Sequence, residues 1–405
     1  MRSGNMSLRI VVALLWLIIV RVTVADDLDR QLELQLAKSG DNKGAMEQAL
    51  AKVPATQKAG MQFLVAWLPT QDLQQLTAER LLENVALATE VRSLAPWQQQ
   101  IPDNIFHNFV LPHACMDEPR DPWRADFYHR FWPWVKDCKT TTEAAQVLNR
   151  RVFAELKVKY STGRRRANQS PAESIEQGLA SCSGLSVILV DACRSVGVPA
   201  RIAGIPKWAN KDGNHTWVEI WDQGWHFTGA AEYDPQGLDH AWFTSDAALA
   251  DPESKLSSIY AVRYEPSGIN FPLPWNPSDD SIHAVNVTER YVNKRVDLPE
   301  GFARVLFSAR NESGKRVALQ VQLSEGTNAS SPVNVPKNSL GKTRDETRDT
   351  NDFLEAVLKK GQTYQIEATD TEGTKIAWEF QTTAEVQQMI EWKWKSSAAA
   401  LIDKQ

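Results

Sequence analysis

Residues 182–201 have the sequence CSGLSVILVDACRSVGVPAR, and this stretch predicts a buried helix followed by a strand. Its apolar residues recur at helical spacing, on a stripe that runs from Leu185 to Val196. Gly197 ends the helix, because glycine accepts the left-handed backbone common at helix C-termini. An extended run follows from Ala200 to Ile205.

The predicted helix begins at Cys182. Unpaired N–H groups and the positive end of the helix dipole favour a negative charge there, which suits a thiolate nucleophile. The same N–H groups suit a developing oxyanion. Cys193 lies eleven residues further along the same helix, about 16 Å away, which is too far for a disulfide. We expect Cys193 to be a small core residue.

Residues 214–228, NHTWVEIWDQGWHFT, predict a β-hairpin with a two-residue turn at Gln223-Gly224. His215 falls near the open end of this hairpin, where a base can face a cysteine on a helix. A cysteine, a histidine and then a carboxylate form a complete set of nucleophile, base and orienting group. Three carboxylates follow the return strand and are candidates for the third role: Glu232, Asp234 and Asp239.

The two segments together resemble the core of the transglutaminase-like superfamily. In this family the nucleophilic cysteine begins a helix, and the helix is followed by Gly-Val/Ile-Pro-Ala-Arg, as in Gly197 to Arg201. The segment from Asn214 to Glu219 is similar to the strand that carries the family's histidine. The close resemblance is confined to this region, with weaker similarity back to residue 105. It implies an α+β, papain-like fold in which Cys182 forms the acyl-enzyme and His215 is the general base and acid.

The third residue departs from the family pattern. The family usually has an aspartate four residues after the return-strand tryptophan, and that position here is Gly229. With a two-residue turn, position 232 would lie opposite His215, and a bulge at Gly229 would re-aim the side chain. We therefore expect Glu232 to orient His215, with Asp234 as the alternative.

Two further residues are candidates for binding the substrate. Gln177, five residues before Cys182, is a candidate for the oxyanion hole. Trp208 lies in the loop before His215 and could line the substrate cleft, with a packing role as the alternative.

The rest of the chain predicts flanking domains. Leucines recur at helical spacing in the N-terminal third, whereas apolar residues alternate at period two beyond a proline-rich segment. The predicted segments are a signal peptide (1–25), a helical N-terminal region (26–104), a transglutaminase-like catalytic domain (105–262), a Pro-rich linker (263–283), a β-sandwich (284–383) and a polar helical tail (384–405).

The N-terminal segment predicts export. Residues 10–20 are an uncharged apolar run, preceded by arginines and followed by small residues suited to cleavage. A helix of that length spans about 16 Å, roughly half of a membrane's apolar core. We expect a periplasmic or extracellular protein without stable membrane insertion, an uncleaved anchor being the alternative. The net charge of −5 gives no indication of a nucleic-acid partner.

The predicted function is a cysteine-dependent acyl transfer through a thioester, from a peptide or a glutamine carboxamide. Hydrolysis, as in a protease or amidase, is favoured over cross-linking to an amine. Neither a metal nor an organic cofactor is required, and a zinc site built on Cys182, His215 and an acid would lack a tight ligand pair. The alternative is a weak or inactive module that binds a cell-envelope or extracellular polymer. In an exported chain Cys115 and Cys138 could form a disulfide.

Overall fold

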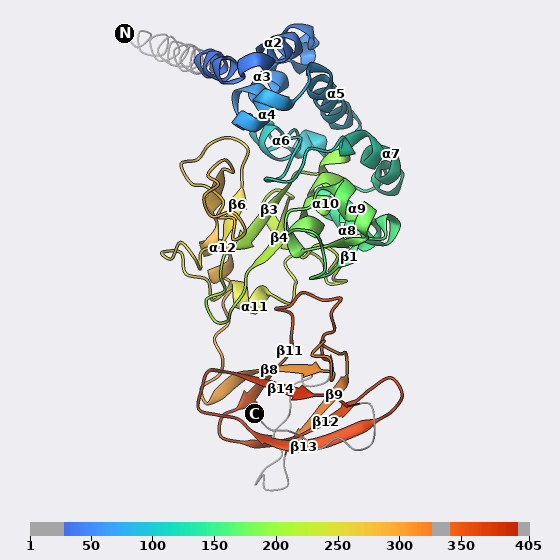
Figure 1. The fold of residues 1–405 in the computed structure, drawn as a ribbon, viewed down its shortest axis with the longest axis vertical. Coiled ribbons are helices and arrows are strands. Elements are labelled where there is room, and N and C mark those ends of the chain that lie inside the picture. Colours follow the sequence, from blue (N-terminus) through green and yellow to red (C-terminus); the bar gives the residue numbers. More distant parts are fainter. Residues whose placement is uncertain (1–27, 326–340, 396–405) are drawn as a thin grey trace, which may run out of the picture.

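A computed structural model of the chain describes residues 28–325 and 341–395. Figure 1 shows three parts along the long axis: helices at one end, a mixed helix-and-sheet part in the middle, and β-strands at the other end. The mixed α+β class predicted from the sequence is confirmed. The predicted signal peptide, residues 1–25, lies outside the described residues.

The N-terminal part consists of helices. Its first helix includes residues 28–38, and three short 3-10 turns lie between the later ones. Thr77 caps α5 by accepting a hydrogen bond from the backbone N–H of Arg80. The helices are α2 (Lys43–Lys52), α3 (Lys58–Ala66), α4 (Thr70–Gln75), α5 (Ala78–Leu94) and α6 (Asp103–Phe109).

The middle part places α10 (Cys182–Ser195) between other helices and a sheet, as the apolar pattern predicts. Every residue of α10 after Cys182 is buried, and the helix contacts α7 (Trp123–Val135) and α8 (Thr141–Leu156) as well as two neighbouring strands of the sheet, β3 (Ala200–Ile205) and β4 (His215–Trp221). The antiparallel sheet has the order β5 (Trp225–Thr228), β4, β3, β6 (Tyr260–Val262) and β7 (Ala284–Asn286). Shorter elements are β1 (Lys159–Tyr160), which pairs with β2 (Leu179–Ala180), and the helices α9 (Pro171–Gln177), α11 (Thr244–Ala247) and α12 (Thr288–Val292).

The exit from α10 requires glycine. Gly197 has a φ of +81°, and a Cβ there would lie 2.5 Å from Nε2 of Gln98. That same nitrogen donates a hydrogen bond of 2.6 Å to the carbonyl oxygen of Gly197. This contact holds the N-terminal helices against the middle part at the point where the chain passes from α10 to β3.

The hairpin of β4 and β5 differs from the prediction by one residue. Trp221 pairs with Trp225, so three residues separate the strands and the turn is not the two-residue turn expected at Gln223-Gly224. Gln223 takes a φ of +58° to make this turn. The observed register would align residue 231 rather than Glu232 with His215, but β5 ends at Thr228, so Glu232 is not a cross-strand neighbour of His215.

The sheet of the middle part extends beyond the predicted linker. β7 follows the proline-rich segment 263–283 and pairs with β6, so residues 284–286 belong to this sheet rather than to the β-sandwich. α12 then packs beside α11. An exposed connector, residues 293–301, leads to the C-terminal part.

The C-terminal part, here called the β-domain (residues 302–325 and 341–395), consists of two sheets. One has the order β10 (Gly341–Lys342), β9 (Gln320–Glu325), β12 (Thr363–Thr369) and β13 (Lys375–Gln381), and the other β11 (Leu354–Lys359), β8 (Phe302–Arg310) and β14 (Gln387–Lys393). Side chains of both sheets form one apolar core, to which Phe307, Ile366 and Trp392 belong. A β-sandwich was expected here.

The predicted helical tail is wrong for residues 387–393. These residues form β14, which pairs in parallel with β8. Trp392 and Trp394 are each only 5% exposed in the sandwich core. The polar residues of this segment resemble an exposed helix face in sequence, but burial of the two indoles in the domain core favours the strand.

The four cysteines are free thiols. Cys115 is buried and its Sγ lies 3.3 Å from Oδ1 of Asp191, so this thiol donates to a carboxylate rather than bonding to Cys138. Cys193 is fully buried, as expected. Among the described residues no helix is both long enough and apolar enough to cross a bilayer.

Candidate active site

Cys182 is the first residue of α10, as predicted. Ser181 caps the helix, and its hydroxyl accepts a hydrogen bond of 3.0 Å from the backbone N–H of Gly184. The first N–H groups of a helix have no partner within the helix, so those beside Cys182 can bind a negative charge. The side chain is partly exposed, whereas the rest of the helix is buried.

His215 is the first residue of β4 and is only 3% exposed. Its imidazole is enclosed by aromatic rings at centroid distances of 4.8 to 6.2 Å, those of Trp208, Trp217, Trp242 and Phe243. These rings restrict the imidazole and exclude water from most of it. The side chain lies on the same face of β4 as Trp217, in the aromatic cluster of the sheet.

Cys182, His215 and Asp349 meet at one point. The thiol sulfur, a ring nitrogen of His215 and a carboxylate oxygen of Asp349 all lie within 4.8 Å of one another. Nδ1 of His215 is 3.4 Å from Oδ2 of Asp349, although neither ring nitrogen makes an in-line hydrogen bond with any described residue. Burial lowers the pKa of His215, but the Asp349 carboxylate and Cys182 outweigh burial and raise this pKa to about 10.

No sequence pattern indicates a role for Asp349. It lies 134 positions after His215, in the loop of residues 343–353 that joins β10 to β11 in the β-domain. The backbone N–H and the side-chain amide of Asn351 donate to Oδ1 of Asp349 at 2.9 and 3.1 Å. Burial raises the pKa of Asp349, but His215 and Asn351 overcome this effect and hold the pKa below its usual value.

Glu232, the predicted orienting residue, lies close to the site without an ion pair to His215. Its Oε1 accepts a hydrogen bond of 2.9 Å from Nε1 of Trp242, whose ring packs on His215. Oε2 is buried without a partner among the described residues. Burial raises the pKa of Glu232 to about 7, although the positive charge of His215 opposes this rise. The alternative residue, Asp234, accepts instead from the backbone of Gln236.

Glu232 occupies the volume that a side chain at position 229 would fill. A Cβ built on Gly229 would lie 1.9 Å from Oε2 of Glu232 and 2.7 Å from its Cδ. The sequence resemblance places an aspartate at this position. The carboxylate of Glu232 thus occupies the space that the β-carbon of any side chain at position 229 would need.

The two predicted substrate-binding residues do not line the cleft at Cys182. The side chain of Gln177 accepts from the backbone of Arg165 and donates to that of Gly163, so its amide holds a neighbouring loop. Trp208 is 1% exposed and stacks on His215 and Trp217. The packing role left open for Trp208 is therefore the observed one.

A cleft of about 360 Å³ opens at Cys182. One wall comes from α8 and β1 and includes Phe153 and Tyr160, and the loop after β5 adds Glu232. The opposite wall belongs to the β-domain and consists of Thr347, Arg348 and Asp349. The cleft therefore lies between two domains.

The cluster of Cys182, His215 and Asp349 also has atom types that can hold a metal ion. A nucleophile, a base and a carboxylate necessarily produce such a cluster. The cysteine at a helix N-terminus and the enclosed histidine point to nucleophilic chemistry, which needs no metal. We therefore interpret the three residues as a reactive group.

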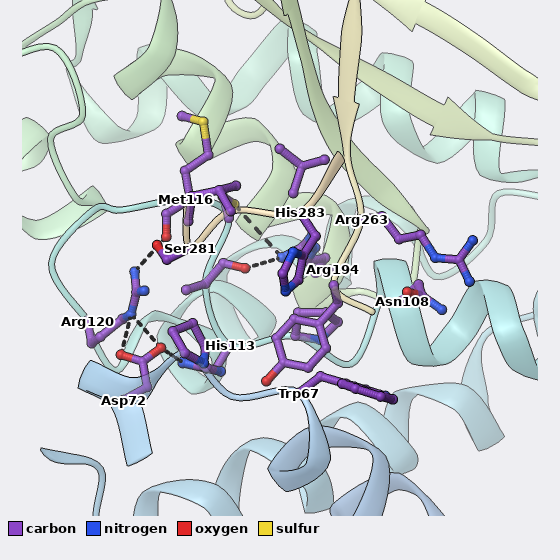
Figure 2. Close-up of a pocket in the computed structure, with 17 residues that line it drawn as sticks. Trp67, Asp72, Asn108, His113, Met116, Arg120, Arg194, Arg263, Ser281 and His283 are labelled. Atoms are coloured by element: carbon purple, nitrogen blue, oxygen red, sulfur yellow. Dashed lines mark hydrogen bonds and ion pairs between the residues drawn. The ribbon is translucent and has the colours of Figure 1, made fainter. Parts of the chain in front are cut away.

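A second, smaller cavity of about 40 Å³ lies where the N-terminal helices meet the middle part. Figure 2 shows Asp72 between Arg120 and His113 in its wall. Asp72 is 2% exposed, and although burial raises the pKa of its carboxyl group, His113 and Arg120 hold this pKa far below its usual value. These groups satisfy one another, which is typical of a structural ion pair.

The helix-borne cysteine, the enclosed histidine and the cleft define a cysteine enzyme site of the nucleophile–base type. Residues 133–230 match the family model of the transglutaminase-like superfamily, and these residues include Cys182, His215 and the hairpin. The chain thus contains a domain of this family, which includes papain-like cysteine proteases and transglutaminases, as the resemblance implied.

The solved structures that are similar to the chain include the following two. A candidate cysteine protease from Cytophaga hutchinsonii is 18% identical with a TM-score of 0.24, over 28% of this chain and 40% of that protein. Red sea bream transglutaminase is 10% identical with a TM-score of 0.31, over 72% of this chain and 66% of that protein. The chain therefore spans less than two thirds of either protein. No curated protein matches it.

Proposed function

We propose that the protein is a cysteine-dependent acyl-transfer enzyme that acts on a peptide or a glutamine carboxamide. The observation that carries this proposal is the position of Cys182, at a helix N-terminus, within 4.8 Å of a ring nitrogen of His215 and open to a cleft. A buried structural cysteine needs none of these three features. Cys193, on the same helix, has none of them.

The reaction begins with attack of the Cys182 sulfur on the carbonyl carbon. A C–S bond forms and the carbonyl oxygen becomes negative beside the first N–H groups of α10, which stabilise it. The C–N bond then breaks, and His215 gives its proton to the leaving amine. The product of this half-reaction is a thioester on Cys182 and a free amine.

Water completes the reaction in the form that we favour. His215 accepts a proton from water as the water attacks the thioester, which releases a carboxylic acid and restores the thiol. Water needs no binding site of its own, whereas an amine acceptor does, and the sequence has no evident amine-binding feature. Cross-linking to a lysine amine is the other outcome of the same thioester.

We still propose that Glu232 orients the imidazole of His215 from the middle part of the chain. Its Oε2 is buried without a partner among the described residues, and it fills the space where the family's aspartate is expected. Catalytic hydrogen bonds are often long before substrate binds.

The test measures alkylation of Cys182 by iodoacetamide in the full chain, with the label located by mass spectrometry. At pH 6 we expect Cys182 to react at least about tenfold faster than Cys138, the partly exposed thiol that serves as an internal control. His215→Ala should remove this advantage. Digestion of casein, with release of ammonia measured in parallel, then separates peptide cleavage from carboxamide hydrolysis.

Equal labelling of Cys182 and Cys138, unaffected by His215→Ala, would overturn the proposal. The non-enzymatic alternative would then be favoured, in which the cleft binds an envelope or extracellular polymer. A Cys182→Ala variant that keeps full function in the cell would support the same conclusion.

We propose in addition that the protein is exported. The support is the pattern of arginines, apolar run and small residues in positions 1–25. Expressed in a bacterial host, the chain should appear in the periplasm or medium with an N-terminus near Asp26. Retention of the full-length chain in the membrane fraction would favour the uncleaved anchor.

A further inference from the structure

Asp349 belongs to a loop whose shape is fixed within the β-domain. The guanidinium of Arg316 donates to five backbone carbonyl oxygens of the 343–353 loop, those of Asp345, Arg348, Asp349, Thr350 and Asp352. The carboxylate of Asp352 is fully buried and accepts from Arg344 and Arg348 at 2.8 and 2.9 Å. The loop therefore presents Asp349 from a rigid support.

Polar contacts fix this loop against the middle part of the chain. The Asn351 amide donates to the carbonyl oxygen of Asn214, the residue before His215, at 3.2 Å. The backbone N–H of Thr350 donates to the hydroxyl of Tyr160 at 3.3 Å. Gly213 makes room for the loop, since a Cβ there would lie 2.4 Å from Oδ1 of Asn351.

A buried ion cluster beside the loop strengthens the docking. Asp246 of α11 is fully buried and is bound by Lys211 at 2.5 Å and by Arg304 of β8. Asn210 joins Asp246 to Gln387 of β14. A charge as deeply buried as that of Asp246 needs partners, so the β-domain is required to satisfy it.

The position of Asp349 relative to the thiol indicates what it does. Groups that bind the two nitrogens of an imidazole from opposite edges are separated by the ring and by two hydrogen bonds of about 3 Å each. The sulfur of Cys182 and the carboxylate of Asp349 lie within 4.8 Å of each other, so both lie on one side of His215. Asp349 thus leaves the other edge of the ring for a second partner, such as Glu232.

The charged groups around His215 come from several elements. Cys182 approaches from α10, Glu232 from the loop after β5, and Asp349 from the β-domain. Two cations of this region are paired with other carboxylates, Lys211 with Asp246 and Arg348 with Asp352. Asp349 is the carboxylate closest to the ring among the described residues.

We infer that the β-domain completes the active site by supplying Asp349 as a positioning residue, which holds His215 in its protonated form beside Cys182. The inference rests on the proposed function of Cys182 and His215. An imidazolium prepared in this way can stabilise the thiolate and protonate the leaving amine. The cysteine and its base would then be fully arranged only while the β-domain is docked.

The test follows the titration of His215 by NMR in the full chain with 13C-labelled histidine, assigned with His215→Ala. In the wild type the His215 resonance should stay in its protonated position through pH 8. Asp349→Asn should lower the titration midpoint by about 1–3 pH units, the usual effect of one adjacent opposite charge. Asp349→Glu should restore most of the shift, and Asp345→Asn, which removes a carboxylate of the same loop, should change nothing.

An unchanged midpoint in folded Asp349→Asn would overturn the inference. If that variant does not fold, Asn351→Ala provides the test, because it removes the amide that holds both Asp349 and Asn214. A midpoint lowered in Asn351→Ala supports the inference, and an unchanged one contradicts it. This titration needs neither substrate nor a reactive thiol, so its result is separate from that of the alkylation experiment.

Discussion

At the scale of single residues, the site keeps several charges in a nearly dry space. His215 is 3% exposed and Asp349 is 3% exposed, yet both are expected to be charged at neutral pH because each stabilises the other. Glu232 has no such close cation. This difference explains why burial raises the pKa of Glu232 while the pKa of Asp349 is lowered.

The raised pKa of Glu232 predicts a pH dependence of stability. In the folded chain this carboxyl has a pKa of about 7, against an ordinary value of 4.5. The folded state therefore binds the proton more tightly than the unfolded state, and stability falls as the pH rises from about 4.5 to 7. Glu232→Gln should remove this loss, which is at most about 3 kcal/mol and smaller because the side chain is partly exposed.

Urea unfolding of both proteins at pH 5 and pH 8 provides the measurement. The variant should gain stability relative to the wild type at pH 8 and much less at pH 5. An equal difference at the two pH values would show that Glu232 is not held in a desolvated environment.

The residues that carry the chemistry were predictable to different degrees. Cys182 and His215 could be located because local patterns, a helix start and a hairpin, determine where they lie. The position of Asp349 depends on how two domains dock, and no local pattern in the charged run of residues 343–353 indicates a partner 134 positions away. Glu232 lies between these cases, because its place depends on a turn that was predicted one residue too short.

At the scale of elements, α10 and its exit form the most constrained part of the molecule. The helix is buried on every side, and its C-terminal glycine packs against a glutamine from the N-terminal helices. Elements with strong local signals were predicted correctly, including α10, β3 and β4. The strand β14 was predicted as a helix because its alternation is weak, and only the burial of Trp392 and Trp394 in the sandwich favours an extended conformation.

A substitution of Gly197 tests the constraint at the end of α10. Gly197→Ala places a methyl group 2.5 Å from Gln98 Nε2 in a backbone region that alanine rarely adopts. We expect a loss of stability of about 2–4 kcal/mol, from strain and from displacement of the glutamine. Gly237→Ala is the matched control, since Gly237 also has a positive φ, of +108°, but a Cβ there makes only an ordinary contact at 3.8 Å.

Thermal or urea unfolding measures both variants. Gly197→Ala should be the less stable by about 1 kcal/mol or more, and the difference isolates the contact with Gln98 from the backbone strain common to both. Similar losses of stability in the two variants would mean that Gln98 and the N-terminal helices move at little cost to make room for the methyl group. The double variant with Gln98→Ala should recover part of the loss.

At the scale of the whole molecule, charged and amide side chains contribute to the docking of the β-domain. The contacts between the β-domain and the middle part include the Asp246 cluster and the amides of Asn210, Asn351 and Gln387. Each domain has its own apolar core, so neither needs the other for folding. We therefore expect the interface to open more readily than either domain unfolds.

Arg304→Met tests this docking. It leaves the fully buried Asp246 without its partner from the β-domain, a change that typically costs about 3–5 kcal/mol. Hydrogen–deuterium exchange of the 343–353 loop and of residues 208–214 should accelerate by more than about tenfold. Arg310→Met, on the same strand but in an exposed pair with Glu391, should cost at most about 1 kcal/mol. Equal exchange in the two variants would contradict the role of Asp246 in docking.

The exposed connector of residues 293–301 joins the cleft's two walls as a single covalent link between α12 and β8. Val296, near its middle, is 90% exposed and accessible to a protease. Cleavage of one peptide bond there would leave both domains folded and Cys182 intact. Asp349 would then reach His215 only when two separate fragments associate, whereas in the intact chain both residues belong to one molecule. The activity of a clipped sample would then depend on its dilution, while that of the intact chain would not.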